Sequence, residues 1–193
     1  MPSRILIVDG HPDPARQRLC HALAEAYIEG ARSTGKETRL ITVAEADFPL
    51  LRTAAEFAAE PTNAAILRAR EDLLWCDHLV MVFPLWLGGA PALLRAFLEQ
   101  VGRANFMAET DGRGIASRLK GRSARLIVTM GMPAFAYTLM FREHGVRNIM
   151  QGVLGFGGIS PIKRSFFGMV EAASDAKRRT WLAKARELGA QGA

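Results

Sequence analysis

The sequence predicts a single α/β domain in which helices cover both faces of a parallel sheet. Short apolar runs rich in β-branched residues alternate five times with longer amphipathic segments. The first run, Ile5-Leu6-Ile7-Val8, is apolar at every position, which is typical of a strand buried on both faces. The length of 193 residues suits one domain spanning 1–193, and no internal repeat or low-complexity linker divides the chain. Each return to a parallel strand needs a crossover, and the helices supply it.

The first part of the chain contains two strands and two helices, which we expect at residues 4–8, 15–33, 38–43 and 63–75. In the first helix, Leu19, Leu23 and Tyr27 recur at a spacing of four, and Gly35 follows as a stop signal. The second helix has similarly spaced apolar positions. We expect residues 47–61, which precede it, to be irregular.

The rest of the chain adds three strands and three helices, which we expect at residues 78–83, 91–101, 124–130, 134–153, 160–167 and 174–188. Pro91 lies just inside its helix, where the missing N–H costs nothing. Pro161 indicates that the last strand starts late. Ser174 is a plausible N-cap of the last helix. The stretch 102–121 is polar and contains glycine, so we expect a long surface excursion.

Composition limits the class of protein. Apolar residues make up 49% and charged residues 23%, the balance of a globular protein. No apolar run approaches the roughly 20 residues that a membrane helix needs. Residues 1–4 lead directly into a strand without the pattern of a signal peptide, so we expect a cytoplasmic protein.

The net charge and the spacing of cysteines and histidines indicate which metals, anions or macromolecules the protein could bind. Cys20 and Cys76 match no metal spacing, and the four histidines are scattered, so we expect no metal site. The net charge of +6 fits a protein that binds phosphorylated anions, although a basic surface kept for solubility is the simpler alternative. The basic residues form no block with interleaved aromatics, and no nucleic-acid-binding motif is present, so we expect no nucleic acid partner.

The loop after the first strand, residues 10–18, is a candidate phosphate site. Ligands of such sheets bind beyond the carboxyl ends of the strands. This loop leads into a helix N-terminus, whose free N–H groups attract anions, and His11, Arg16 and Arg18 add cationic donors. The alternative is a capped helix start with solvated arginines. The sequence contains neither GxxxxGK[ST] nor GxGxxG after this strand, which disfavours ATP and a Rossmann-bound dinucleotide.

The loop after the third strand, residues 83–91, is a candidate site for a flat ring. It is apolar, bracketed by prolines, and contains Gly88 and Gly89, which let backbone approach a ligand closely. The alternative to a ligand site is a packed core loop in which Trp86 covers the surface and contacts no ligand.

The third candidate segment is residues 129–137. Thr129 and Gly131 could lie against the same ligand. Tyr137 and His144 are seven residues apart within the predicted helix 134–153, so they would share a face. The alternatives are an aromatic packed at a helix start and a histidine that caps a helix end before Gly145.

Together, these loops resemble the NAD(P)H:quinone oxidoreductase (diaphorase) family of flavodoxin-like flavoproteins. The stretches that carry the resemblance are Ile7-Val8-Asp9-Gly10-His11-Pro12, residues 83–91, residues 129–137, and Leu154-Gly155-Phe156-Gly157-Gly158-Ile159 with Phe167-Gly168. The resemblance implies a flavodoxin-like three-layer sandwich, with a five-stranded parallel sheet in the order 2-1-3-4-5 and bound FMN.

The resemblance also implies the site residues. Those expected at the flavin phosphate are His11, Arg16, Arg18, Leu19 and Cys20. Those expected along the isoalloxazine, largely through backbone, are Pro84, Leu85, Trp86 and Leu87. Those expected at its other edge are Thr129, Met130 and Gly131. Those expected near the acceptor, as catalytic residues, are Tyr137 and His144.

The sequence departs from the family at several of these positions. Members often carry Ser or Thr, an aromatic and Asn in the phosphate loop, where this chain has Arg18-Leu19-Cys20, so phosphate binding would rely on arginine. Members often have aromatics at the positions of Leu87 and Gly88, which implies a roomier pocket here. One residue more separates Tyr137 from His144 than in well-known members. The C-terminal extension of the long members is missing, which favours FMN over FAD.

The resemblance implies a reaction as well. NAD(P)H would pass hydride to the flavin and leave, and a quinone or a related azo or nitro acceptor would then take two electrons. The family usually works as a homodimer. The alternatives are a flavin-binding electron carrier and a regulatory partner at the surface of a membrane ion-efflux system.

Overall fold

A five-stranded parallel sheet forms the centre of the protein. The computed structural model describes residues 3–110 and 115–192. The strands of the sheet are β1 (Arg4–Asp9), β2 (Glu37–Thr42), β3 (His78–Pro84), β6 (Ser123–Thr129) and β7 (Ile162–Phe167). They lie in the order β2-β1-β3-β6-β7, and every neighbouring pair is parallel. Counted within the sheet alone, this is the order 2-1-3-4-5, so the predicted fold is confirmed.

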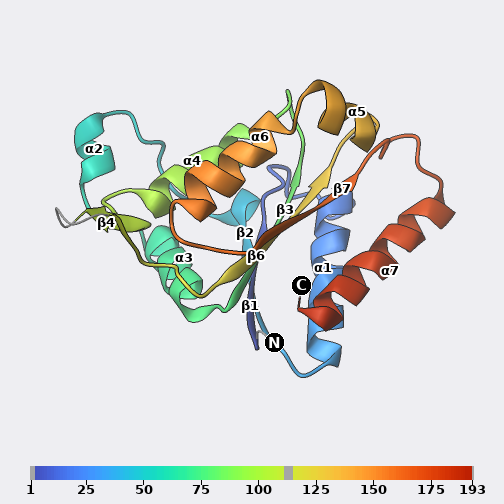
Figure 1. Ribbon diagram of the computed structural model, residues 1–193, viewed down its shortest axis with the longest axis horizontal. Helices are drawn as coiled ribbons and strands as arrows, with labels where there is room; N and C mark the ends of the chain where they lie inside the picture. The colour runs from blue at the N-terminus through green and yellow to red at the C-terminus, as the bar shows by residue number, and fades with distance from the viewer. Residues whose placement is uncertain (1–2, 111–114, 193) are drawn as a thin grey trace.

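Helices form a layer on each face of the sheet (Figure 1). The helical segments are α1 (Leu19–Ser33), η1 (Val43–Glu45), α2 (Ala54–Ala58), α3 (Ala64–Trp75), α4 (Ala92–Gly102), α5 (Ala134–Met140), α6 (His144–Arg147), η2 (Asn148–Gly155) and α7 (Asp175–Gln191). Figure 1 shows α1 and α7 on one face, and α3, α4 and α6 on the other. The domain therefore has three layers.

The central strands supply the core of both layers because successive side chains point to opposite faces. Ile5 and Ile7 of β1 pack in the cluster that contains α1 and α7. Leu6 and Val8 pack in the cluster that contains α3 and α4. β3 is buried along its whole length. This explains why the strands are continuously apolar in sequence.

Two glycines bring α1 and α7 into close contact. A Cβ added to Gly30 would lie 1.9 Å from the carbonyl oxygen of Arg186, and one added to Gly189 would lie 2.0 Å from that of Tyr27. The backbones of the two helices thus meet where neither residue has a side chain. Ser174 caps α7 by accepting a hydrogen bond from the Lys177 N–H, as the sequence predicts.

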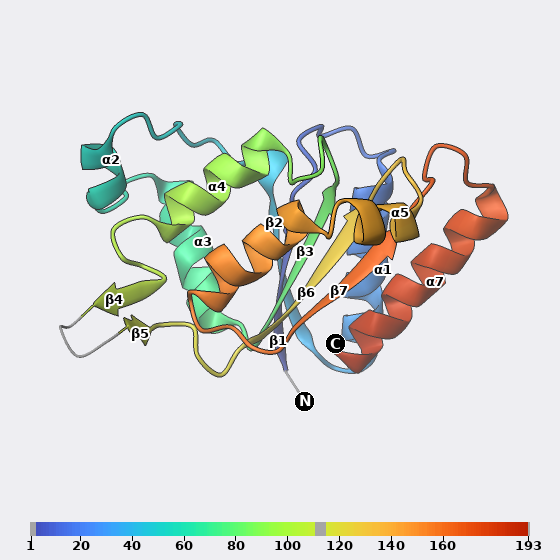
Figure 2. The same cartoon turned by 45° about the horizontal axis from the view of Figure 1, so that its top comes forward.

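Two segments expected to be irregular contain regular structure. α2 lies within residues 47–61, and its N-cap is Thr53. Within residues 102–121, β4 (Ala108–Thr110) pairs antiparallel with β5 (Ile115–Ser117). Figure 2 shows this pair apart from the main sheet. Both segments are short and lack a long apolar repeat, so periodicity could not reveal them.

The first helix begins at Leu19, not at residue 15 as periodicity predicts. The reason is local hydrogen bonding. The Asp13 carboxylate accepts hydrogen bonds from the Ala15 N–H (2.8 Å) and from Arg18 Nε (2.8 Å), which holds the residues before Leu19 in a turn. The chain therefore stays in the loop for four more residues.

The predicted single helix over 134–153 is wrong, because the chain breaks after α5. Arg142 and Glu143 have φ values of 47° and 57°, in the left-handed region, and α6 starts at His144. The Glu143 side chain is 1% exposed, and its Oε2 lies 2.6 Å from Arg164 Nε on β7. A long-range ion pair thus fixes a break that helical periodicity cannot detect. Beyond α6, the chain continues as the π-helical segment η2.

Candidate functional site

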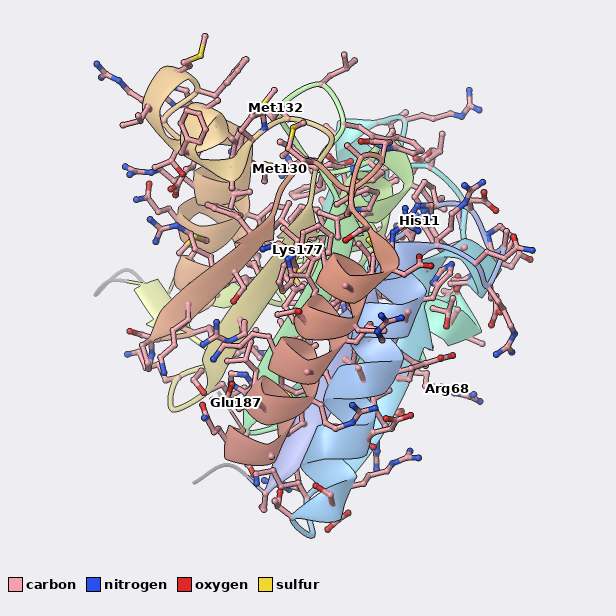
Figure 3. The ribbon with its side chains drawn as sticks, turned by 90° about the vertical axis from the view of Figure 1, so that its right-hand side faces the viewer. His11, Arg68, Met130, Met132, Lys177 and Glu187 are labelled. Carbon is pink, nitrogen blue, oxygen red and sulfur yellow. The ribbon has the colours of Figure 1, made fainter. Side chains whose placement is uncertain are left out.

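The predicted loops meet at one edge of the sheet. The Gly10 N–H donates to the Val82 carbonyl at 2.7 Å, and the Leu85 N–H donates to the Thr129 carbonyl at 2.7 Å. The His11 and Trp86 rings lie edge to face, with their centroids 6.3 Å apart. Figure 3 shows His11, Met130 and Met132 toward one end of the molecule and Glu187 toward the other. The ends of β1, β3 and β6 therefore form one continuous surface.

The N-terminus of α1 is open to an anion. Its N-cap residue is Arg18, whose side chain makes no capping hydrogen bond, and the first turn contains no acidic residue. The first N–H groups of a helix carry a partial positive charge and need a partner. A phosphate group at this point would supply it. The residues present therefore fit the predicted phosphate.

The two predicted arginines lie in the loop that precedes α1. Arg18 is exposed and pairs with Asp13, which holds its guanidinium beside the helix start. Arg16 is more exposed, and its NH1 lies 3.8 Å from Glu25. Leu19 is half-buried and begins the helix. Arg18 is thus the better placed cation for a phosphate at α1.

Cys20 lies beneath this helix start. Its side chain is 1% exposed and shares a hydrogen bond of 3.3 Å with the Thr129 hydroxyl at the end of β6. Burial raises the pKa of the Cys20 thiol to about 12, so the thiol stays protonated. Cys20 thus joins the first and third segments, and only its backbone can face an anion.

Two further charged residues support the first loop, and sequence reasoning missed both. Asp9 ends β1, and His21 lies in the first turn of α1. The two side chains are 3% and 7% exposed, and His21 Nδ1 contacts Asp9 Oδ2. His21 Nε2 lies 2.9 Å from the Asp13 carbonyl oxygen. The only sequence signal was a carboxylate directly after a buried strand.

His11 is held in the neutral form. Its Nδ1 faces both the Asp13 N–H, at 3.1 Å, and the Asp13 carbonyl oxygen, at 3.2 Å, and the His11 N–H donates to Asp9 Oδ1 at 3.1 Å. Burial lowers the pKa of His11, and the nearby His21 lowers it further. In the tautomer whose Nδ1 accepts from the Asp13 N–H, Nε2 carries the proton and has no acceptor among the described residues. It remains available as a donor to a ligand.

The second loop is a tight apolar turn that follows Pro84, the last residue of β3. Trp86 and Gly89 exchange two backbone hydrogen bonds of 2.9 Å, and Leu87 and Gly88 between them have φ values of 48° and 78°. Trp86 is half exposed and Leu87 is fully exposed, whereas Leu85 is half-buried. The turn therefore exposes apolar side chains and backbone at this edge of the sheet, and the binding of a flat ring there stays a prediction.

The third segment is anchored to the second by Tyr137. The Tyr137 hydroxyl donates to the Gly88 carbonyl at 3.0 Å and accepts from the Val146 N–H at 3.3 Å. A Cβ added to Gly145 would lie 2.2 Å from the same Gly88 oxygen. Burial raises the pKa of Tyr137, which keeps the hydroxyl protonated. Tyr137 of α5 and Gly145 of α6 thus both contact the backbone of the tight turn at Gly88.

Thr129, Met130 and Gly131 end β6 at the same edge. Thr129 and Met130 are buried, and Gly131 is exposed. A Cβ added to Gly131 would lie 2.9 Å from the Glu171 carboxylate, which comes from the loop after β7. That loop is the fourth at this edge, and Glu171 is not among the predicted site residues.

Tyr137 and His144 do not share a helix face. Tyr137 is fully buried in α5, whereas His144 is exposed at the start of α6, beyond the left-handed break. The spacing of seven residues therefore does not bring the two side chains together in the way a continuous helix would.

Exposed apolar side chains surround this edge of the sheet. Those above 40% exposure on the second loop and on α5 with its C-cap are Trp86, Leu87, Phe135, Leu139, Met140 and Phe141. We call Phe135, Leu139 and Met140 the α5 apolar face. Exposed apolar side chains that gather in this way mark a surface that contacts a ligand or another protein.

Two other features of the described residues are the grouping of potential metal ligands and the apolar character of the helices. No group of three or more potential metal ligands is present among the described residues. Within 3–110 and 115–192, no helix combines the length and the apolar character that crossing a membrane requires.

Comparison with known proteins places the chain among similar sequences and folds. An uncharacterized NAD(P)H oxidoreductase of Haemophilus influenzae is 24% identical over 196 residues, which cover 96% of this chain and 92% of that protein. The FMN-dependent NADH:quinone oxidoreductase 3 of Bacillus anthracis is 24% identical over 82% of this chain and 83% of its own length.

A solved structure has a similar fold. The NAD(P)H:quinone oxidoreductase of Methanothermobacter marburgensis superposes with a TM-score of 0.83 at 20% identity, over 98% of both chains. The sequence profile of a family described by its flavodoxin-like fold matches residues 3–188. The chain therefore belongs to this family of proteins with the flavodoxin-like fold.

Proposed function

We propose that this chain is an FMN-dependent oxidoreductase that transfers hydride equivalents from NAD(P)H to a quinone in two successive half-reactions. The observation that carries the proposal is the pairing, at one sheet edge, of an uncapped helix N-terminus with a tight apolar turn. The first suits a phosphate and the second suits a flat ring. The names of the relatives in Haemophilus influenzae and Bacillus anthracis support the same reaction class.

The phosphate end of the cofactor would bind at the start of α1. The backbone N–H groups from Leu19 onward would donate to it, with Arg18 as the neighbouring cation. The neutral His11 would add its Nε2–H. Arg16 would contribute long-range attraction, because its side chain points into solvent beside Glu25.

The ring would lie between the second and third segments. Pro84, Leu85, Trp86 and Leu87 would line one side, and Thr129, Met130 and Gly131 the other. Bound FMN would supply the chemistry, since a flavin accepts hydride and releases two electrons to an acceptor. The protein would contribute orientation and the exclusion of water from the reacting face.

Tyr137 and His144 would then have different roles. Tyr137 is buried, so it would act by holding the Gly88 carbonyl and thereby the shape of the ring site. His144 is exposed and precedes Gly145, which packs against Gly88. His144 is therefore the residue of the two that an incoming acceptor can meet.

We also propose that the protein works as a homodimer in the cytoplasm. The α5 apolar face and the exposed Leu87 would be covered by a second copy. Sedimentation of the purified protein tests this, and a monomer at micromolar concentration would contradict it.

The direct test is the visible spectrum of the purified protein, with mass identification of any released flavin. We expect FMN, loss of its absorbance when NADH or NADPH is added without oxygen, and its return when a quinone follows. Protein that cannot be loaded with FMN would contradict the proposal. Flavin that binds but is not reduced by NAD(P)H would instead indicate an electron carrier or a regulatory partner of a membrane transporter.

A substitution tests the phosphate site. Arg18→Asp should cap α1 and place a carboxylate where the phosphate binds, so FMN affinity should fall about tenfold to a hundredfold while the helix remains stable. Riboflavin, which has no phosphate, should bind both proteins equally. Arg16→Asp is the matched control, because it makes the same charge change in the exposed part of the loop. Equal losses in the two variants would contradict this placement.

A further inference from the structure

A buried ion pair lies directly beneath the proposed phosphate loop. Asp9 and His21 join the end of β1 to the first turn of α1, and both side chains are more than nine-tenths buried. From His21, a second contact of 2.9 Å reaches the Asp13 carbonyl oxygen. Asp13 in turn holds the Ala15 N–H and Arg18. The loop is thus connected to the sheet through His21.

The contacts of His21 define its charge. Both ring nitrogens face oxygens that can only accept, a carboxylate at Nδ1 and a carbonyl at Nε2. Both nitrogens must therefore donate, which makes His21 an imidazolium. The neighbouring His11 is neutral, although the two ring centroids are only 5.3 Å apart.

Although both side chains of the Asp9–His21 pair are mostly buried, a surface hollow gives solvent access to them. A hollow of about 170 Å³ lies beside it, on the β2 side, and is lined by Asp9, Arg16, His21, Glu25, Thr42 and Glu45, among others. The titratable and charged groups near His21 are therefore Asp9 from β1, His11 and Asp13 from the loop, Arg16, and the carboxylates of Glu25 and Glu45. A proton can reach His21 by this route while a ligand occupies the sheet edge.

We propose that His21 is a positioning residue for the cofactor phosphate, and that its charge state sets how tightly the phosphate is held. The inference rests on the proposed function. A cation in the first turn of a helix opposes the helix dipole, and Asp9 offsets this in the free protein. A bound phosphate would meet the dipole and Arg18, on the loop whose shape the His21 hydrogen bond to the Asp13 carbonyl maintains.

The direction of the pH effect follows from the contacts. Burial by itself lowers the pKa of His21, but the hydrogen bonds to Asp9 and to the Asp13 carbonyl outweigh it and raise the pKa above that of free histidine. Below this pKa, His21 is charged and holds the loop. Above it, the proton should leave Nε2, because the carboxylate at Nδ1 is the stronger acceptor. The bond to the Asp13 carbonyl is then lost, and phosphate affinity falls.

The test compares FMN and riboflavin affinities, from quenching of flavin fluorescence, between pH 6 and pH 9.5. We expect FMN affinity of the unaltered protein to fall about tenfold across this range, the loss of one charge-assisted hydrogen bond. Riboflavin affinity should stay constant. A phosphate monoester gains charge as pH rises through about 6, which would strengthen binding, so the expected fall has the opposite sign.

Two substitutions separate the contacts of His21. His21→Gln places a donor at the position of Nε2, keeps the bond to Asp13, and cannot ionise. Its FMN affinity should stay within about threefold of the unaltered protein at pH 6 and should not fall at pH 9.5. His21→Asn places a donor at the position of Nδ1 only, so its FMN affinity should be about tenfold lower at every pH. His78→Asn, at the opposite edge of the sheet, is the control and should keep the pH profile.

The outcomes are distinguishable from failure of the proposed function. If the unaltered protein does not bind FMN, the proposed function is wrong. If it binds FMN with no alkaline loss, or if His21→Gln loses affinity at high pH as strongly as the unaltered protein, the role of His21 is overturned. Should a variant fail to fold, the FMN and riboflavin profiles of the unaltered protein decide alone.

Discussion

At the scale of single residues, Tyr137 connects two loops through one hydroxyl group. Tyr137→Phe should lower the free energy of unfolding by about 1–2 kcal/mol, because the buried Val146 N–H and the Gly88 carbonyl lose their partner. Urea unfolding measures this. Phe141→Leu is the control for ring stacking, since Phe141 stacks on Tyr137 with centroids 6.1 Å apart. A smaller loss for Tyr137→Phe than for Phe141→Leu would contradict the hydroxyl's role.

The sequence predicts the position of the candidate loops better than it predicts the contacts within them. Arg18 and the second loop lie where the strand-end rule places them, because parallel strands end at a common edge. The Asp9–His21 pair was missed because burial and pairing depend on how α1 packs on β1, which no local pattern records. The buried state of Tyr137 was left open for the same reason.

At the scale of elements, the contact between α1 and α7 depends on glycine. Gly30→Ala should destabilise the protein by about 2–3 kcal/mol, because the new methyl group would overlap the Arg186 carbonyl and force the helices apart. Thermal unfolding should show a fall in Tm of about 4–12 °C. Gly102→Ala in α4 is the matched control, since its nearest neighbour would lie at an ordinary 3.5 Å. A similar Tm for both variants would show that the helices can separate without cost.

The existence of the longer helices is predicted well here, whereas the short α2 and the continuity of the helix over 134–153 are not. The apolar spacing over 134–153 is real, yet Glu143 interrupts it by pairing with Arg164 on a strand that follows in the chain. Periodicity reports which residues face the core. It does not report whether the backbone stays helical between them.

At the scale of the whole molecule, buried His78 contributes to the loss of stability in acid. It is 2% exposed, and burial, with Arg125 and Lys163 nearby, lowers the pKa of His78 to about 4. The unfolded chain binds this proton near pH 6.5 and the folded chain does not. The contribution of His78 to stability is therefore complete above pH 6.5 and should fall by about 3 kcal/mol as pH drops toward 4.

His78→Asn tests this dependence. Asparagine can keep the bond to the Ser123 hydroxyl, which His78 Nδ1 makes at 2.7 Å, and it does not ionise. Urea unfolding between pH 4 and pH 7 should give a flatter profile for the variant. An unchanged slope would assign the acid sensitivity to other groups.

His21 acts in the opposite direction, because its raised pKa gives stability that is present at low pH and lost as pH rises through that pKa.

The parallel sheet is the part of the architecture that the sequence pattern predicts most fully, because each return to a parallel strand needs a crossover and the helices between the apolar runs supply it. The order of the strands is predicted from the family resemblance and is confirmed. The pair β4 and β5 was not predicted, because three-residue strands outside the sheet carry too little pattern.

The glycine contact between α1 and α7 also has a consequence for synthesis on the ribosome. The apolar face of α1 is completed by a helix that begins about 140 residues after α1 ends. At roughly 5–20 residues per second, that face waits on the order of 10–30 s for its cover. During this interval, the nascent chain exposes an apolar surface, and closure of this layer depends on a segment that is translated long after α1.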